Sequence, residues 1–309
     1  MNSKDRTTRF KGFDKWIQFQ VVRITYFSFQ ILPLKLVFSI GGLLGGIAFH
    51  CFKNRRLQVY ENIQHLKIWA QEKGIQNLIL AEDTQVLTKT LFVRNMANFL
   101  SSICLLNKGK KQLNNAIEIE NLELFEKTYA GNKGVIVLFP HMGPWELITQ
   151  FPNIFSSIIE PGQMGSLYRP LNNYYTNRWY LRQRQRNGMK LYSRDDGFLS
   201  MIRFLKKQSV LFVPFDQRLR EGVAVPLFGK PAQTPNLSTL FYRKTQAPVL
   251  SFSIIQCGHA QWKMKFFQLP ISDMNVEDGS LFLERSNELL EQIILESPCD
   301  YFFFQNRYK

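Results

Sequence analysis

The chain has 309 residues, enough for one large α/β domain or for one domain with a helical extension. Lys and Arg outnumber Asp and Glu by 39 to 24, and the net charge of +15 favours a polyanionic partner: nucleic acid, an anionic lipid surface or a phosphorylated substrate. Because no helix-turn-helix, zinc-finger or RNP-like signature is recognisable, nucleic acid is the weakest of the three. The four cysteines are scattered without a CxxC pair, which argues against a disulfide scaffold or a zinc site and fits the reducing cytosol.

The N-terminal part of the chain has the composition of a membrane anchor. Basic residues are frequent in 1–15, residues 16–32 mix aromatic and aliphatic side chains with few charges, and 34–52 is almost wholly apolar. The apolar run is borderline in length for spanning a bilayer, and a helix lying in the interface or a glycine-rich core helix are the alternatives. It begins too far from Met1 for a cleaved signal peptide. We therefore expect 1–55 to be a retained, membrane-anchoring helical segment.

The remaining residues, 56–309, are expected to form one domain. Residues 56–130 show helical periodicity with a break at Gly74, which predicts a helical lead-in. From residue 131 on, the pattern changes to short apolar runs separated by helices, with strands expected at 134–139, 164–168, 209–215 and 247–255. This alternation predicts an α/β fold with a mixed, mostly parallel sheet flanked by helices.

The most informative stretch begins where the first of these strands ends. His141 follows the β-branched run directly, and Glu146 comes five positions later, just after a Pro and a Trp that indicate the first turn of a helix. Open α/β sheets keep their active sites at such strand ends. Glu146 could hold one ring nitrogen of His141 in its protonated form and leave the other as a base for an alcohol. Taken alone, a His followed by a Glu at this spacing also occurs by chance.

Charged residues follow two further strands. Between 161 and 194 there is no acidic residue but there are seven basic ones, and Arg169 directly follows a predicted strand, which indicates an anion-binding mouth or a solvated basic helix face. The strand at 209–215 ends at Asp216 and Gln217. If Asp216 lies beside His141, it could bind a sugar acceptor or raise the pKa of the imidazole; alone it would be an ordinary strand-end carboxylate.

Other catalytic templates are missing from the sequence, which contains no GxSxG elbow, no P-loop lysine motif and no GxGxxG. In their order and spacing, the motifs resemble those of the bacterial lipid A biosynthesis acyltransferases, the lauroyl and myristoyl transferases of the HX4D/E superfamily related to lysophospholipid acyltransferases. The resemblance covers nearly the whole chain, and its residues are Arg55, Arg56 and Asn62; the motif at 140–146; Tyr168, Arg169 and Pro170; Asp216 and Gln217; the run 226–229 with Thr234; the run 247–249; and a C-terminal aromatic stretch with Arg307 and Lys309.

This resemblance implies an acyltransferase domain at 56–309 in which His141, oriented by Glu146, deprotonates a hydroxyl that attacks an acyl thioester. It also implies acyl carrier protein as donor, a membrane glycolipid, most simply a lipid A precursor, as acceptor, and an inner-membrane protein whose catalytic domain faces the cytoplasm. Arg169, Asp216 and Gln217 are expected to contact substrate, and the backbone N–H groups around Gly143 could share in binding the oxyanion. No metal or organic cofactor is implied.

The sequence departs from the family pattern at 303–307, where a Trp and a His-Arg-Arg run are usual, and around 236–241. These departures keep alternatives open: an acyltransferase for another glycolipid or for a lysophospholipid with an acyl-CoA donor, and a catalytically silent lipid-binding protein. The missing FPEGTR-like run disfavours a glycerophospholipid acceptor.

Overall fold

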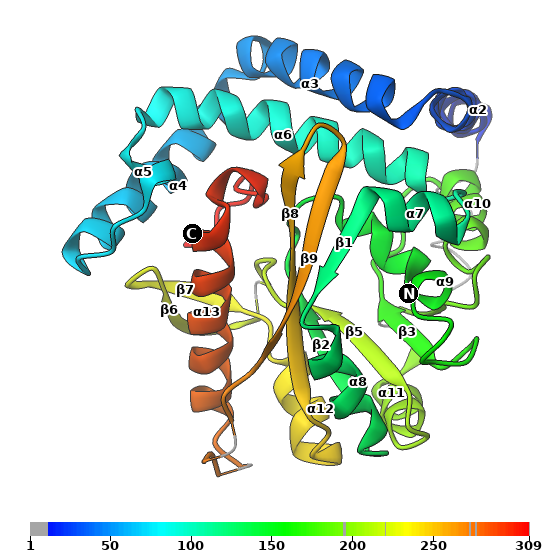
Figure 1. The fold of residues 1–309 in the computed structure, drawn as a ribbon, viewed down its shortest axis with the longest axis vertical. Helices are drawn as coiled ribbons and strands as arrows, with labels where there is room; N and C mark the ends of the chain where they lie inside the picture. The colour runs from blue at the N-terminus through cyan, green and yellow to red at the C-terminus, as the bar shows by residue number, and fades with distance from the viewer. Residues whose placement is uncertain (1–11, 194–195, 220, 272, 276, 309) are drawn as a thin grey trace.

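The computed structural model describes residues 12–308 except 194–195, 220, 272 and 276 (Figure 1). The basic residues expected within 1–11, together with Arg194 and Lys309, therefore lie outside the described residues. The N-terminal third is helical: α2 (Phe13–Ile31), α3 (Leu34–Cys51), α4 (Lys53–Glu72), α5 (Leu78–Ala81), α6 (Thr84–Leu105) and α7 (Lys110–Ala116). The predicted break at Gly74 is confirmed, because this residue follows α4 with a φ of +66°.

A seven-stranded sheet forms the centre of the molecule. Its order is β1-β9-β8-β2-β5-β3-β4, with bounds Ile117–Glu120, Gln261–Gln268, Val249–Gly258, Val135–Phe139, Val210–Pro214, Met164–Leu167 and Lys190–Tyr192. All neighbouring strands run parallel except β8 and β9, which form an antiparallel hairpin. The prediction of a mixed, mostly parallel sheet is confirmed. The run 226–229 joins β6 (Val223–Leu227) to β7 (Lys230–Thr234), which form a separate two-stranded sheet.

Helices cover both faces of the large sheet, because the side chains of β2 alternate between two hydrophobic cores. Ile136 and Leu138 belong to one core, and Val135 and Val137 belong to the other. The first core is closed by α4, α11 (Phe198–Leu205), α12 (Leu237–Thr245) and α13 (Gly279–Glu296), and the second by α7, α8 (Leu122–Ala130) and α9 (Phe151–Ile154). α10 (Tyr174–Arg184) contributes no buried residue to either core.

The apolar run expected to be an anchor forms α3, which lies along α6 (Figure 1). A β-carbon at Gly41 would lie 2.6 Å from the Cα of Ala97, so the two backbones pass too close for any larger residue at this position. The opposite face of α3 is apolar and exposed, at Leu36, Leu43, Leu44 and Ile47. Among the described helices, α3 is the one long and apolar enough to cross a membrane, over Leu34–Cys51. One of its faces is thus packed on protein and the other is available to lipid.

The boundary expected after residue 55 does not coincide with a break in secondary structure, since residue 55 lies in the first turn of α4. α2 packs through Phe19 and Tyr26 against Trp179 on α10. Of the described part of this segment, α2 thus contacts α10, and α3 contacts the lead-in helix α6 and also, through Phe38 and Ser39, Trp262 and His259 of the β8–β9 hairpin.

Candidate active site

His141 and Asp216 lie side by side because they follow adjacent parallel strands. β2 pairs with β5 from Val135 opposite Val210 to Phe139 opposite Pro214, so both strands end at the same edge of the sheet. In Figure 1 the arrowhead of β8, which runs parallel to β2, points towards α6, and this edge therefore lies under α6. The site stands at the carboxyl edge of the sheet, where open α/β folds bind their ligands.

Asp216 holds His141 by two short hydrogen bonds. The backbone N–H of His141 donates to Oδ2 and its Nδ1–H donates to Oδ1, each over 2.7 Å. Asp216 is 3% exposed and His141 is half-buried. Burial by itself lowers the pKa of His141, but the charge and hydrogen bond of Asp216, together with the charge of Glu146, outweigh it, and the pKa stands above its ordinary value. Burial likewise raises the pKa of Asp216, yet the contacts with His141 hold it below the usual range.

The other ring nitrogen of His141 faces Gln217. The side-chain amide nitrogen of Gln217 lies 2.9 Å from Nε2, so with the proton on Nδ1 the amide donates to an unprotonated Nε2. Gln217 itself is exposed, unlike Asp216. Nε2 is therefore an unprotonated ring nitrogen on the open side of the site, and once the Gln217 amide moves away its electron pair can take a proton, as that of a general base does.

Glu146 does not occupy the place expected for it. Both of its carboxylate oxygens accept from one guanidinium nitrogen of Arg184, at 2.6 Å, and Tyr180 bonds to the same nitrogen at 3.2 Å. No hydrogen bond joins Glu146 to His141 among the described residues. The expectation that Glu146 orients the imidazole is corrected: the strand-end carboxylate does so, because pairing of β2 with β5 sets it directly beside the ring. Glu146 lies in the first turn of a helix, as expected, and this helix is a 3₁₀ helix, Trp145–Gln150.

The arginines of the basic stretch divide into one that enters the site and several that remain outside it. Arg184 is packed over the ring of Tyr180 at 4.2 Å and reaches the buried Glu146. Burial lowers the pKa of Arg184, but Glu146 and Tyr180 together raise it by more, so the guanidinium stays charged. Arg169 is exposed in the segment after β3, as are the outward-facing arginines of α10 and the residues just after it, Arg178, Arg182 and Arg186. In the sequence nothing distinguished Arg184 from these neighbours.

The loop that carries His141 is paired with a late part of the chain. The N–H of Phe302 donates to the carbonyl of His141, and the N–H of Gly143 donates to the carbonyl of Asp300, both over 2.9 Å. Met142 forms an isolated antiparallel bridge with Tyr301. The suggestion that the Gly143 amide helps to bind an oxyanion is therefore wrong for this conformation, because that N–H already has a partner inside the protein.

Arg307 supports Asp216 from the same late segment. Its side chain, 4% exposed, donates to the backbone carbonyl of Asp216 and, over 3.2 Å, to the hydroxyl of Thr234. Asn62 on α4 donates to the carbonyls of Phe303 and Gln305 and so fixes the segment from the other side. The sequence singled out Arg307, Thr234 and Asn62 through the resemblance alone and gave none of them a role.

Aromatic rings line the site next to the imidazole. The ring of Trp145 lies 5.6 Å from that of His141, and Phe302 lies 5.5 Å from Trp145. Further ring contacts run from Phe302 to Phe304 and on to Phe92 of α6. Apolar surface of this kind suits an alkyl chain near the reacting atoms.

Comparisons with known proteins show the family to which this chain belongs. The profile of the family described as bacterial lipid A biosynthesis acyltransferase matches residues 3–309. A protein of Haemophilus influenzae named lipid A biosynthesis acyltransferase is 25% identical over 281 residues, which cover 87% of this chain and 80% of that protein. A crystal structure of the 1-acyl-sn-glycerophosphate acyltransferase PlsC from Thermotoga maritima aligns with a TM-score of 0.36 at 15% identity, over 82% of this chain and 96% of that one. Because the family profile spans nearly every residue, the chain belongs to the bacterial lipid A biosynthesis acyltransferases and is an acyltransferase.

Proposed function

We propose that this acyltransferase moves a fatty acyl chain from acyl carrier protein to a hydroxyl of a lipid A precursor, with His141 as the general base and Asp216 as its orienting partner. The observation that carries the proposal is the contact of Nδ1 of His141 with Asp216, which leaves Nε2 without a proton and directed to the open side of the site. The family profile and the name of the Haemophilus influenzae relative support a lipid A precursor as the acceptor.

The reaction moves one proton from the acceptor hydroxyl to His141 and then from His141 to the departing thiolate. Nε2 of His141 takes the proton of the acceptor hydroxyl as its oxygen attacks the thioester carbonyl, and a tetrahedral oxyanion forms. Collapse of this intermediate breaks the carbon–sulfur bond, and the departing thiolate takes the proton from Nε2. The charge of Asp216 stabilises the imidazolium between these two events. The acceptor hydroxyl must replace the Gln217 amide beside Nε2. The displaced amide stays next to the hydroxyl, so we assign Gln217 to acceptor binding.

Two arginines are given separate roles, one in binding the acceptor and one beside the reacting centre. We assign the exposed Arg169 to a phosphate of the acceptor, because a guanidinium at the carboxyl edge of the sheet can pair with phosphate by two hydrogen bonds. Glu146 holds Arg184 near His141, and the charge of Arg184 offsets part of the rise in the pKa of His141. Arg184 thus supplies positive charge beside the reacting centre. In this assignment Glu146 contributes to catalysis by fixing Arg184.

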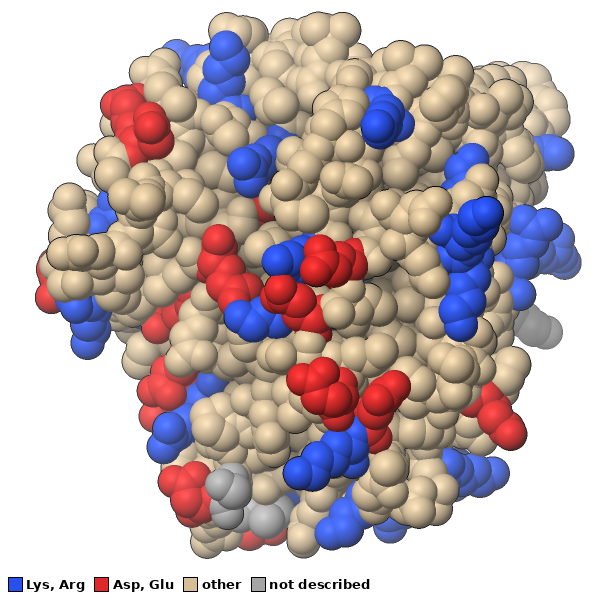
Figure 2. Space-filling model, viewed as in Figure 1, with Lys and Arg blue, Asp and Glu red and all other residues tan. Residues whose placement is uncertain are grey.

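The charge distribution favours an acidic donor protein. Lys and Arg gather without acidic neighbours at the side of the molecule where α7 and α10 lie (Figure 2). Over α13 and the β8–β9 hairpin, by contrast, Lys and Arg are mixed with Asp and Glu. The Lys and Arg residues of α7, of the outward face of α10 and just after α10 are Lys110, Lys111, Arg178, Arg182 and Arg186. No Asp or Glu occurs between residues 84 and 117 or between 161 and 194. Such a surface would steer the acidic acyl carrier protein to α10, which carries Arg184 into the site.

The exposed apolar face of α3 supports attachment to the inner membrane, with the catalytic domain on the cytoplasmic side where acyl carrier protein is found. The carboxyl edge of the sheet lies under α6, and α3 packs on that helix. A lipid acceptor held in the bilayer would therefore meet the site at the face that carries the anchor.

The test combines donors, acceptors and one pair of variants. The purified protein is incubated with acyl-carrier-protein or acyl-CoA donors and with a lipid A precursor, a mannosylated phosphatidylinositol or a lysophospholipid, and products are identified by mass spectrometry. We expect transfer from the carrier protein to the lipid A precursor. Transfer to the lysophospholipid alone, or to no glycolipid, would overturn the proposal. His141→Ala should abolish turnover, whereas His259→Ala, at an exposed residue bonded to Ser39, should leave it unchanged.

A further inference from the structure

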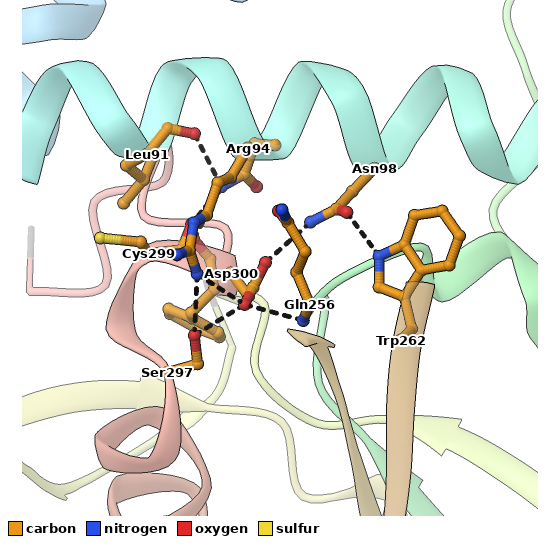
Figure 3. Close-up of polar contacts among 10 residues, drawn as sticks. Leu91, Arg94, Asn98, Gln256, Trp262, Ser297, Cys299 and Asp300 are labelled. Atoms are coloured by element: carbon orange, nitrogen blue, oxygen red, sulfur yellow. Dashed lines mark hydrogen bonds and ion pairs between the residues drawn. The ribbon is translucent and has the colours of Figure 1, made fainter. Parts of the chain in front are cut away.

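The carboxylate of Asp300 is buried under α6 and accepts hydrogen bonds from four groups, two of them on that helix (Figure 3). Asn98 on α6 donates to Oδ1 over 2.9 Å. Oδ2 accepts from Ser297 over 2.6 Å, from the backbone N–H of Gln256 on β8 over 3.1 Å, and from the Arg94 guanidinium over 3.2 Å. The side chain has no exposed surface, so every one of these donors is needed to replace water.

The donors are themselves fixed. The indole N–H of Trp262 on β9 donates to the amide oxygen of Asn98 over 2.8 Å, which leaves the amide nitrogen directed at Asp300. Asn95, one residue after Arg94 on α6, donates to the carbonyls of Cys299 and Tyr301 on either side of Asp300. A buried network of this kind has one arrangement that satisfies all its members, and it sets the position of the backbone at residue 300.

This backbone holds the loop of the proposed base. The carbonyl of Asp300 accepts from Gly143, the following residue bridges to Met142, and Phe302 donates to the carbonyl of His141. His141 is thus held between Asp216 on one side and the segment anchored by Asp300 on the other. The left-handed φ of +59° at Gly143 fits only a glycine in this tight passage.

We propose that Asp300 is a positioning residue for catalysis: by fixing residues 300–302 it sets the distance between His141 and Asp216. The inference rests on the proposed role of His141 as base. It assigns a function to a carboxylate that contacts neither substrate nor the imidazole and that carries no resemblance to a catalytic motif. Displacement of the loop would lengthen the hydrogen bond between Nδ1 and the Asp216 carboxylate, so the pKa of His141 would fall as the rate falls.

The test is Asp300→Asn, which keeps the size of the side chain but turns an N–H₂ group towards donors. The matched control is Glu296→Gln, the same chemical change on α13 at a residue whose two carboxylate oxygens bind Ser253 and Lys265 and not Asp300. We expect Asp300→Asn to lower kcat by about 10²-fold with KM little changed, the loss that follows from misplacing a catalytic group by about 1 Å. Glu296→Gln should leave both constants near those of the wild type.

The second readout is the pKa of His141, followed by NMR of protein labelled in its four histidines. In Asp300→Asn this pKa should fall, and the acidic limb of the pH–kcat profile should move to lower pH with it. A folded variant with wild-type kcat and an unshifted His141 pKa would overturn the inference, as would a loss of kcat without the pKa shift. If Asp300→Asn does not fold, Arg94→Gln, which removes one half-exposed donor, must produce the same two changes in smaller measure, and wild-type values there would refute the inference equally. Failure of the proposed function is seen separately, as activity retained by His141→Ala.

Discussion

Replacing Asp216 by Asn tests which carboxylate, that of Asp216 or that of Glu146, orients the imidazole of His141. Both oxygens of Asp216 are engaged by His141, one at the backbone N–H and one at Nδ1. An Asn that keeps its oxygen on the backbone N–H turns its N–H₂ group to Nδ1, which must then accept. The ring proton moves to Nε2, and the electron pair that would take the acceptor proton is lost.

The expected loss is that of the general base. A positioned base contributes about 10²–10⁴-fold to the rate, or about 3–5 kcal/mol of transition-state stabilisation at about 1.36 kcal/mol per factor of ten. Since Asp216 is almost wholly buried, the acceptor does not reach it and KM should change little. The assay is steady-state transfer from a thioester donor over a range of pH, with Asp273→Asn at an exposed position as the control.

The pH dependence gives a second, independent sign. Asp216 has a depressed pKa, so its stabilising contribution is complete above its ordinary pKa and is lost as pH falls through the depressed value. His141 has a raised pKa, so its contribution is complete below its ordinary pKa and is lost as pH rises through the raised value. The difference in unfolding free energy between wild type and Asp216→Asn should peak between these two pKa values. Activity should instead rise as His141 loses its proton.

Two results would refute this reasoning. One is an Asp216→Asn enzyme that keeps kcat within about tenfold of the wild type, below the range expected for a lost base. The other is a Glu146→Gln enzyme whose acidic limb moves to lower pH while that of Asp216→Asn stays in place, which would restore Glu146 as the orienting residue.

Three further predictions concern packing and buried charge. Gly41→Ala should destabilise the protein by about 1–3 kcal/mol, because its β-carbon meets the α6 backbone. Gly46→Ala, whose β-carbon would have no atom within 4 Å, should be neutral or stabilising by up to about 1 kcal/mol. Urea unfolding of both variants in the same detergent compares them. Arg184→Met should cost about 3–5 kcal/mol by leaving the buried Glu146 unpaired, and adding Glu146→Gln should recover part of it in a double-mutant cycle. Arg307→Lys should cost about 1–3 kcal/mol in urea unfolding, because one ammonium cannot serve both acceptors of the guanidinium; an unchanged midpoint would contradict it.

The fold and half of the site were accessible from local sequence patterns. The apolar runs of β2 and β5 are short, β-branched and bounded by polar residues, and such strands in a parallel sheet bring their carboxyl ends to one edge. His141 and Asp216 could therefore be placed near one another without knowledge of the register. The apolar run of α3 was also recognisable, although its close packing on α6 was not.

The partner of the imidazole could not be predicted, because a short spacing in sequence competes with a long-range contact that leaves no local signal. Glu146 is five residues from His141, and Asp216 is 75 residues away. The choice between them depends on Arg184, which binds Glu146 and is one of seven basic residues in a stretch that looks uniform in sequence. Asp300 was missed for the same reason, since its partner Asn98 is 202 residues away.

The pairing of the His141 loop with residues 300–302 also constrains how the enzyme folds. The loop lies near the middle of the chain, and the groups that hold it are supplied by residues made much later: Asp216 after 75 residues, and then Arg307 after a further 91. Contacts of such high sequence separation form only after long loops have closed, which slows folding. A ribosome-bound chain that ends before residue 300 can contain most of the sheet and still lack a fixed base. If His141 is the base, we therefore expect catalytic competence to develop late in folding, once residues 300–307 have joined the His141 loop and Asp216.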